Sequence, residues 1–309
     1  MMKIFKIIVG LIGITSSLHA QQEAMFSQYM FNTLAINPAY AGSRNLISAT
    51  GLLRAQWTGI PGAPKTSTFT IDAPIEDKKM GVGLQLFSDK IGITTTSGAF
   101  ATYAYRIRMD KASLSFGMQA GFSQFRADFS SVALTSEGNS NDGAFRENVS
   151  RILPNVGAGV YFNSDRFYIG LSSPQILNNK VSELKAEATN SFSKKQTHLF
   201  LASGYVVPLG SEFSFKPSIL VKGVQGAPIE ADLNGTLWIK NAIAFGVQYR
   251  TKAALAGLME IQMTPQLRFG YAYDYSTTSL KEFSAGSHEI MLRYEFGFEK
   301  GKVLSPRYF

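Results

Sequence analysis

The stretch LRFGYAYDY, residues 267–275, decides the fold, together with IMLRYEFGF at residues 290–298. In both, every second residue is large and apolar or aromatic, and the residues between are mostly charged, polar or small. Side chains of a β-strand alternate between its two faces, so this period of two predicts strands with one apolar face. The same alternation recurs at residues 114–122 and 243–249.

The face opposite the apolar one distinguishes a membrane barrel from a soluble β-sandwich. Here it carries Arg, Glu, Gln, Asp and many Gly, and the alternating runs reach about ten residues, the length that crosses a bilayer as a tilted strand. In lipid, an open sheet edge would leave backbone groups unpaired, so the sheet has to close. We therefore predict an all-β fold, a transmembrane antiparallel β-barrel with apolar side chains toward lipid and polar ones toward the lumen.

The alternation gives about fourteen strands, with a margin of about two. They span approximately residues 45–58, 64–74, 80–88, 93–107, 111–125, 153–163, 166–172, 195–206, 212–222, 228–239, 242–250, 253–263, 266–275 and 287–298. With both chain ends periplasmic, the two longest connections, 126–152 and 173–194, fall on the exterior side, as expected for outer-membrane barrels. Within the second, residues 179–189 are compatible with a short helical turn.

The two ends of the chain differ from the barrel region. Residues 1–20 read as a secretory signal peptide, because Lys3 and Lys6 precede an apolar run and then small residues. We predict four regions: a signal peptide at 1–20, an N-terminal periplasmic plug or docking segment at 21–44, the outer-membrane barrel at 45–298, and a C-terminal tail at 299–309. The chain has no Cys, which excludes disulfides and thiolate metal sites.

The residue types that carry chemistry are sparse. After residue 20 there are two histidines, His198 and His288, on different predicted strands. The formal net charge is +8, but Lys and Arg are spread singly, so no nucleic-acid site is expected. The motif Glu289, Arg293 and Glu295 shares one face of the last strand, which suggests an ion-pair ladder in the lumen. We expect no enzyme activity, no cofactor and no metal site.

Aromatic residues near the predicted strand ends suit the interfacial girdles of a membrane barrel. These residues are Trp57, Tyr103, Tyr105, Trp238, Tyr249, Tyr273 and Tyr275. The alternative is that they are ordinary core aromatics of a sandwich.

Two motifs before and around the first strand carry a family resemblance. The sequences FSQYMFNTLAINPAYAG and LRAQWTGIPGAPKTSTFTIDAP resemble the opening of the PorP/SprF family, outer-membrane proteins associated with the type IX secretion system of Bacteroidetes. The resemblance implies a partner-binding role for the matching positions. These are Gln28, Tyr29, Asn37, Pro38, Ala39, Tyr40, Gly42, Arg54, Trp57, Gly59, Gly62 and Pro64.

The resemblance further implies a barrel that binds secretion machinery or a cargo C-terminal domain, for export or surface retention of adhesins, including those of gliding motility. The expected partners are outer-membrane lipid and either components of the type IX secretion machinery or a secreted cargo protein. We expect Tyr29 and Tyr40 to act as exposed aromatic anchors in the segment that starts on the periplasmic side. The alternative is a passive porin or small-molecule outer-membrane transporter, which the barrel alone equally allows.

Overall fold

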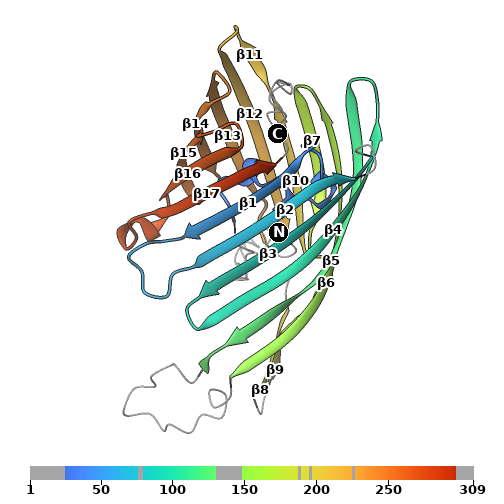
Figure 1. Ribbon diagram of the computed structural model, residues 1–309. Coiled ribbons are helices and arrows are strands. Elements are labelled where there is room, and N and C mark those ends of the chain that lie inside the picture. Colours follow the sequence, from blue (N-terminus) through green and yellow to red (C-terminus); the bar gives the residue numbers. More distant parts are fainter. Residues whose placement is uncertain are drawn as a thin grey trace, which may run out of the picture.

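The chain forms a closed antiparallel β-barrel of fourteen strands (Figure 1). The computed structural model describes residues 25–75, 79–129, 148–186, 189–194, 197–224 and 227–296. The predicted signal peptide at 1–20 and the tail at 299–309 lie outside these ranges. Neighbouring wall strands pair in chain order, and β1 pairs with β17 from Ile47↔Phe296 to Ala55↔His288, which closes the sheet.

The wall strands match the fourteen predicted ones, with boundaries shifted by a few residues. Their bounds are β1 (Ile47–Ala55), β2 (Lys65–Ile75), β3 (Met80–Ile91), β4 (Thr94–Arg108), β5 (Ala112–Ala127), β6 (Val149–Ser164), β7 (Phe167–Ser173), β10 (His198–Tyr205), β11 (Val207–Leu209), β12 (Phe213–Val224), β13 (Glu230–Ile239), β14 (Ile243–Arg250), β15 (Ala254–Gln262), β16 (Leu267–Ser276) and β17 (Ser287–Phe296). β10 and β11 both pair with β12 and form one wall strand interrupted at Val206.

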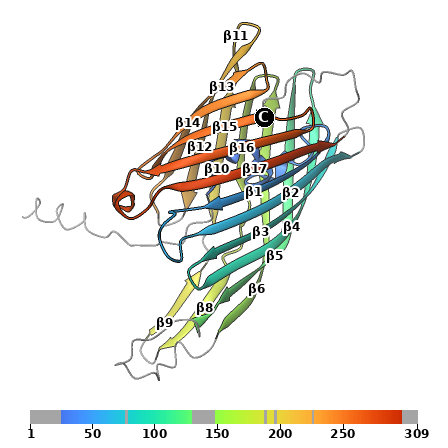
Figure 2. The ribbon, with the colours of Figure 1, turned by 60° about the vertical axis from the view of Figure 1, so that its left-hand side comes forward.

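One expectation within the wall connections was wrong. Residues 179–189 do not form a helical turn, because β8 (Lys180–Ala186) and β9 (Thr189–Lys194) pair as a separate two-stranded hairpin. This hairpin lies beyond the end of the wall (Figure 2).

The two faces of the wall are those predicted from the alternation. Outward-pointing Met118 and Leu292 are 63% and 50% exposed, whereas inward-pointing Gln119 and Arg293 are 4% and 2% exposed. A belt of exposed apolar side chains on a closed sheet is what lipid contact requires. Among the described residues, no helix is long and apolar enough to cross a membrane.

The connections divide the barrel into two ends. One end, here called the long-connection end, carries the connections 56–64, 128–148, 174–197 and 277–286. The other, here called the short-turn end, carries the connections 76–79, 109–111, 165–166, 210–212, 240–242 and 263–266. In outer-membrane barrels short turns face the periplasm and long loops face outward, so the long-connection end is the exterior end.

The expected aromatic girdle is found in part. Tyr103, Tyr105 and Tyr249 are between 42% and 49% exposed on the outer face. Trp238 is a correction: its side chain is 5% exposed and packs edge-on against Phe31 inside the barrel.

Candidate functional site

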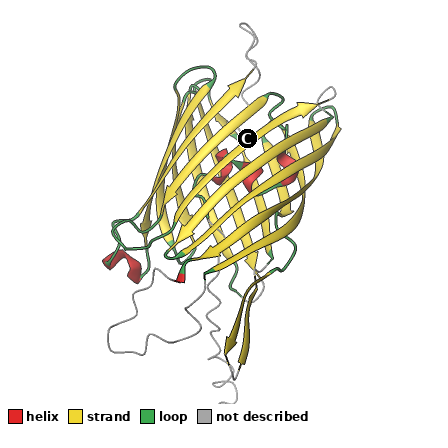
Figure 3. Cartoon of the chain, turned by 60° about the horizontal axis from the view of Figure 1, so that its bottom comes forward, coloured by secondary structure: helices red, strands yellow, loops and turns green. Residues whose placement is uncertain are grey.

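The lumen is occupied by residues 27–43, here called the lumen segment. It contains three short 3-10 turns, η1 (Tyr29–Phe31), η2 (Thr33–Ala35) and η3 (Pro38–Tyr40). Figure 3 shows these turns enclosed by the ring of strands. All but one of its residues are buried, so the segment forms the core of the molecule together with the inner wall.

Local sequence explains why this segment bends repeatedly and does not form one helix. Asn37 lies in an extended conformation before Pro38, and its side-chain oxygen accepts a hydrogen bond from the Ala39 backbone N–H at 2.9 Å. Pro38 sets the first position of η3 with a fixed φ, as proline does at helix starts. Gly42 then takes a φ of +67°, where a side chain would be strained.

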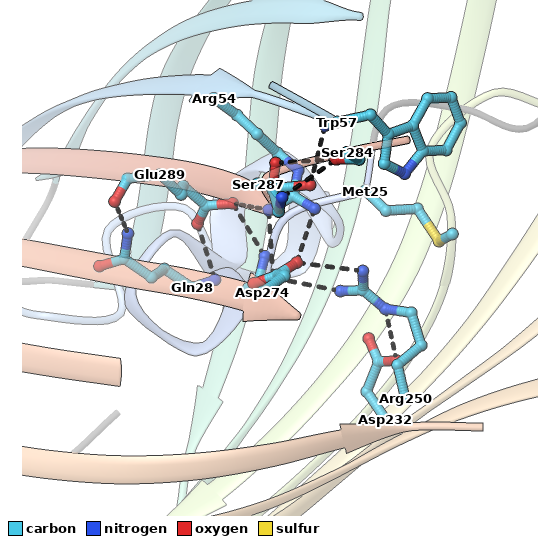
Figure 4. Close-up of polar contacts among 12 residues, drawn as sticks. Met25, Gln28, Arg54, Trp57, Asp232, Arg250, Asp274, Ser284, Ser287 and Glu289 are labelled. Carbon is cyan, nitrogen blue, oxygen red and sulfur yellow. Dashed lines mark hydrogen bonds and ion pairs between the residues drawn. The ribbon is translucent and has the colours of Figure 1, made fainter. Parts of the chain in front are cut away.

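The first end of the lumen segment is held by charged side chains of the wall, here called the Arg54 cluster (Ser27, Gln28, Arg54, Asp274 and Glu289). The Glu289 carboxylate accepts the backbone N–H groups of Ser27 and Gln28 at 2.9 and 2.8 Å. The Ser27 hydroxyl donates to Asp274 at 2.7 Å. Arg54 lies between the two carboxylates, 2.7 Å from Asp274 and 2.9 Å from Glu289 (Figure 4).

The Arg54 cluster continues along the neighbouring strands. Arg250 lies 3.6 Å from Asp274 and 3.0 Å from Asp232. Lys222 in turn lies 2.9 Å from Asp232 and 3.2 Å from Glu230. Positive and negative side chains thus alternate from β1 across β16 and β14 to β12. Each charged residue of this row has an opposite charge beside it, as buried charges require.

The middle of the lumen segment is packed by aromatic and polar contacts. The Asn234 side chain donates to the Tyr29 hydroxyl at 2.9 Å, and Thr70 donates to the Asn32 side-chain oxygen at 2.9 Å. Phe31 lies edge-on to Trp238 with ring centroids 6.3 Å apart.

Glycines of the inner wall make room for the second half of the lumen segment. A Cβ built on Gly81 would overlap the Ala41 carbonyl, and one on Gly117 would overlap the Ala39 backbone. A Cβ on Gly159 would likewise overlap the Asn37 side chain. These positions therefore need glycine for close approach of the segment to the wall.

Polar groups fix the other end of the lumen segment. Asp72 accepts the Gly42 backbone N–H at 2.7 Å, and the Arg106 guanidinium donates to the Ala41 carbonyl at 3.1 Å. Arg44 then pairs with Glu295 at 2.7 Å just before β1 begins. Arg293 donates to the Phe31 carbonyl. The motif Glu289, Arg293 and Glu295 thus pairs with other elements and does not form a ladder of its own.

The part of the second motif that follows β1, residues 56–64, forms an ordered rim at the long-connection end. The Thr58 backbone N–H donates to the Gly286 carbonyl, and the Ala285 N–H donates to the Thr58 carbonyl, both at 2.8 Å. On the other side, the Gly92 N–H donates to the Gly62 carbonyl at 2.8 Å. The rim, defined as residues 56–64, therefore joins the connection 277–286 to the turn after β3.

The predicted site residues separate into two places. The structure brings Gln28, Tyr29, Asn37, Pro38, Ala39, Tyr40, Gly42 and Arg54 together in the lumen, and it puts Trp57, Gly59, Gly62 and Pro64 in the rim. The expectation that the two tyrosines are exposed anchors was wrong, because Tyr29 and Tyr40 are 2% and 5% exposed. The segment that carries these tyrosines was expected to start on the periplasmic side. It instead spans the lumen and is not confined to the periplasmic mouth.

Sequence reasoning missed the wall residues that hold the lumen segment. Asp274, Asp72 and Arg106 were not singled out, although each is a charged residue at an inward position of an alternating strand. Their place in the alternation, on the polar side of the strand, was the signal that could have identified them. Among the described residues, no group of three or more His, Asp or Glu side chains is arranged to hold a metal ion.

Comparisons with known proteins agree with this architecture. A family model described as type IX secretion system membrane protein PorP/SprF matches residues 18–294. No curated protein sequence matches the chain. Among solved structures, the CymD monoaromatic hydrocarbon channel is similar with a TM-score of 0.52 and 12% identity, over 90% of this chain and 94% of that chain. The toluene transporter TbuX of Ralstonia pickettii has a TM-score of 0.50 and 9% identity, over 89% and 94%. At such identities these likenesses show the barrel fold alone.

Proposed function

Because the chain belongs to the PorP/SprF family of type IX secretion system membrane proteins and forms an outer-membrane barrel, we propose that it binds secretion machinery or a cargo C-terminal domain. In this role it serves export or surface retention of adhesins, with no catalytic step and no cofactor. The alternative remains a passive porin or small-molecule transporter of the outer membrane.

The observation that carries this proposal is the filled lumen. A passive pore needs a continuous water-filled path, lined by polar side chains. Here the lumen segment occupies the interior, and its Tyr29, Leu34 and Ala39 are 2% exposed or less. Charges that line a porin channel are free to meet solute, whereas Arg54 and Glu289 are 3% and 0% exposed and bind each other. This interior supports a binding role over a conducting one.

We assign the partner contact to the rim and not to the lumen segment. Buried aromatic anchors dominate interfaces, but they must be accessible before the partner binds. The residues Gln28 to Gly42 are covered by the wall, so we give them the role of holding the lumen closed. Trp57 is half-buried and Gly59 is exposed at the exterior mouth, next to Phe283, which is 71% exposed.

A complementation experiment tests the function. A strain that lacks the chain should lose secretion or surface retention of at least one adhesin-like cargo, while uptake of small solutes stays unchanged. The purified wild-type protein should give no large, long-lived conductance steps in planar bilayers. Normal secretion combined with impaired uptake and a stable open conductance would instead establish the porin alternative.

A variant in the connection 277–286, which is hydrogen-bonded to the rim, then locates the contact. Phe283→Ser should reduce cargo secretion or retention with the barrel still assembled, because the side chain contributes little to the core at 71% exposure. The matched control is Met109→Ser, at 49% exposure on the short-turn end. Faster migration of the unboiled protein on a gel checks assembly in the same cells. A defect with Met109→Ser alone would move the contact to the periplasmic end.

A further inference from the structure

The lumen segment runs from one end of the barrel to the other. At its start, Ser27 bonds to Asp274, two residues before the end of β16, and to Glu289, two residues after the start of β17. Both positions are at the long-connection end. At its finish, the Gly42 N–H bonds to Asp72 in the last part of β2, which leads into a short turn. The segment therefore finishes at the short-turn end, where β1 begins.

The residues just before Ser27 stay at the long-connection end. The Met25 sulfur lies 2.8 Å from the Lys222 ammonium, near the end of β12. Lys222 pairs with Glu230, the first residue of β13, across the connection 225–229. That connection is also at the long-connection end. Met25 and Phe26 are both half-buried, whereas the two residues that follow them are buried.

We propose that the chain is threaded through its own barrel, so that Met25 and Phe26 are presented at the exterior mouth. The first strand nevertheless starts at the periplasmic end. The N-terminal stretch thus contributes an element to the surface that faces outward, beside Lys222 and Glu230.

The lumen segment contacts both halves of the wall. The Ser27–Phe31 part of the segment contacts strands of the second half of the chain, through Asp274, Glu289 and Asn234. The later part contacts the first half, where Asn37 donates to the Val160 carbonyl at 3.1 Å. The segment therefore connects both halves of the wall from inside.

Cysteine labelling tests the direction of threading, and the chain has no native Cys to interfere. Met25→Cys is compared with Phe283→Cys at the long-connection end and with Lys79→Cys, an exposed residue at the short-turn end. Intact cells are treated with a membrane-impermeant maleimide and compared with permeabilised cells. We expect Met25→Cys and Phe283→Cys to be labelled several-fold more than Lys79→Cys in intact cells, and all three to react after permeabilisation.

Labelling of Met25→Cys only under the conditions that label Lys79→Cys would overturn the proposal. Protection of Met25→Cys in both preparations would overturn it as well, because the residue would then not be presented at either mouth. Phe26→Cys serves as the second variant if Met25→Cys does not give a heat-modifiable barrel. If Phe283→Cys and Lys79→Cys exchange sides, the barrel orientation is reversed and the exterior placement fails.

Discussion

Replacing Arg54 by Ala removes the central charge of the Arg54 cluster. Asp274 and Glu289, with side chains 4% and 0% exposed, then lose their shared partner. Breaking a buried ion pair from one side costs about 3–5 kcal/mol, because it leaves an uncompensated buried charge. Ser27 still donates to both carboxylates, and Arg250 lies 3.6 Å from Asp274. These remaining partners offset part of the loss, so we expect Arg54→Ala to lower the free energy of unfolding by about 3 kcal/mol.

Equilibrium unfolding by denaturant in lipid vesicles measures this change, with the fluorescence of lumen-buried Trp238 as a reporter. The matched control is Lys240→Ala, which breaks an ion pair with Glu212 at 3.2 Å, where the side chains are 66% and 54% exposed. Such a surface pair contributes at most about 1 kcal/mol. Adding Asp274→Asn to Arg54→Ala removes one orphaned charge, leaves an oxygen to accept the Ser27 hydroxyl, and should restore part of the stability. Arg54→Ala indistinguishable from Lys240→Ala would refute the reasoning.

Three further variants test the wall and the lumen segment by the same unfolding measurement. Leu292→Arg places a charge on the lipid face and should cost about 2–4 kcal/mol near the bilayer midplane; a neutral effect would contradict the assigned faces. Gly117→Val should cost about 1–3 kcal/mol by pushing into the Ala39 backbone. Gly257→Val is its control, because a Cβ there meets nothing within 4 Å, and equal effects would argue against the packing role. Tyr29→Ala should cost about 3–5 kcal/mol, as for other buried aromatics; unchanged stability would mean that the lumen segment is not part of the core.

The wall was predictable because its chemistry is repeated at every second residue. Leu292 and Arg293 show why: neighbours in the chain point to lipid and to lumen, so a shift by one residue would exchange the two environments. Trp238 shows where this reasoning was not applied. It has the same parity as inward-facing Asn234 and Thr236, yet it was assigned to the girdle from its residue type and its position near a strand end. Parity is the stronger signal, because it is fixed by the backbone.

The lumen segment was harder to predict because its partners are distant in the chain. The bend at Asn37-Pro38 depends on local backbone chemistry, because proline restricts the residue before it to an extended conformation. Burial of Tyr29 depends on Asn234, which is 205 residues away, and no local pattern reports such a contact. The inward glycines were noticed as a property of the wall. The residues that pack against these glycines could not be predicted from the sequence without knowing which segment fills the lumen.

The small residues of the lumen segment and the glycines of the inner wall pack directly against each other. Ala39 and Ala41 are 0% exposed, and each approaches a wall glycine so closely that a methyl group on the wall would overlap the segment. Small residues on one side are useful only if glycine stands on the other, and this mutual requirement explains why NPAYAG is followed by strands with inward glycines. A barrel that conducts has no reason to remove side chains from its inner face at these positions. The matched small residues therefore favour a lumen built to stay filled, and they direct the search for partner contacts to the two mouths of the barrel.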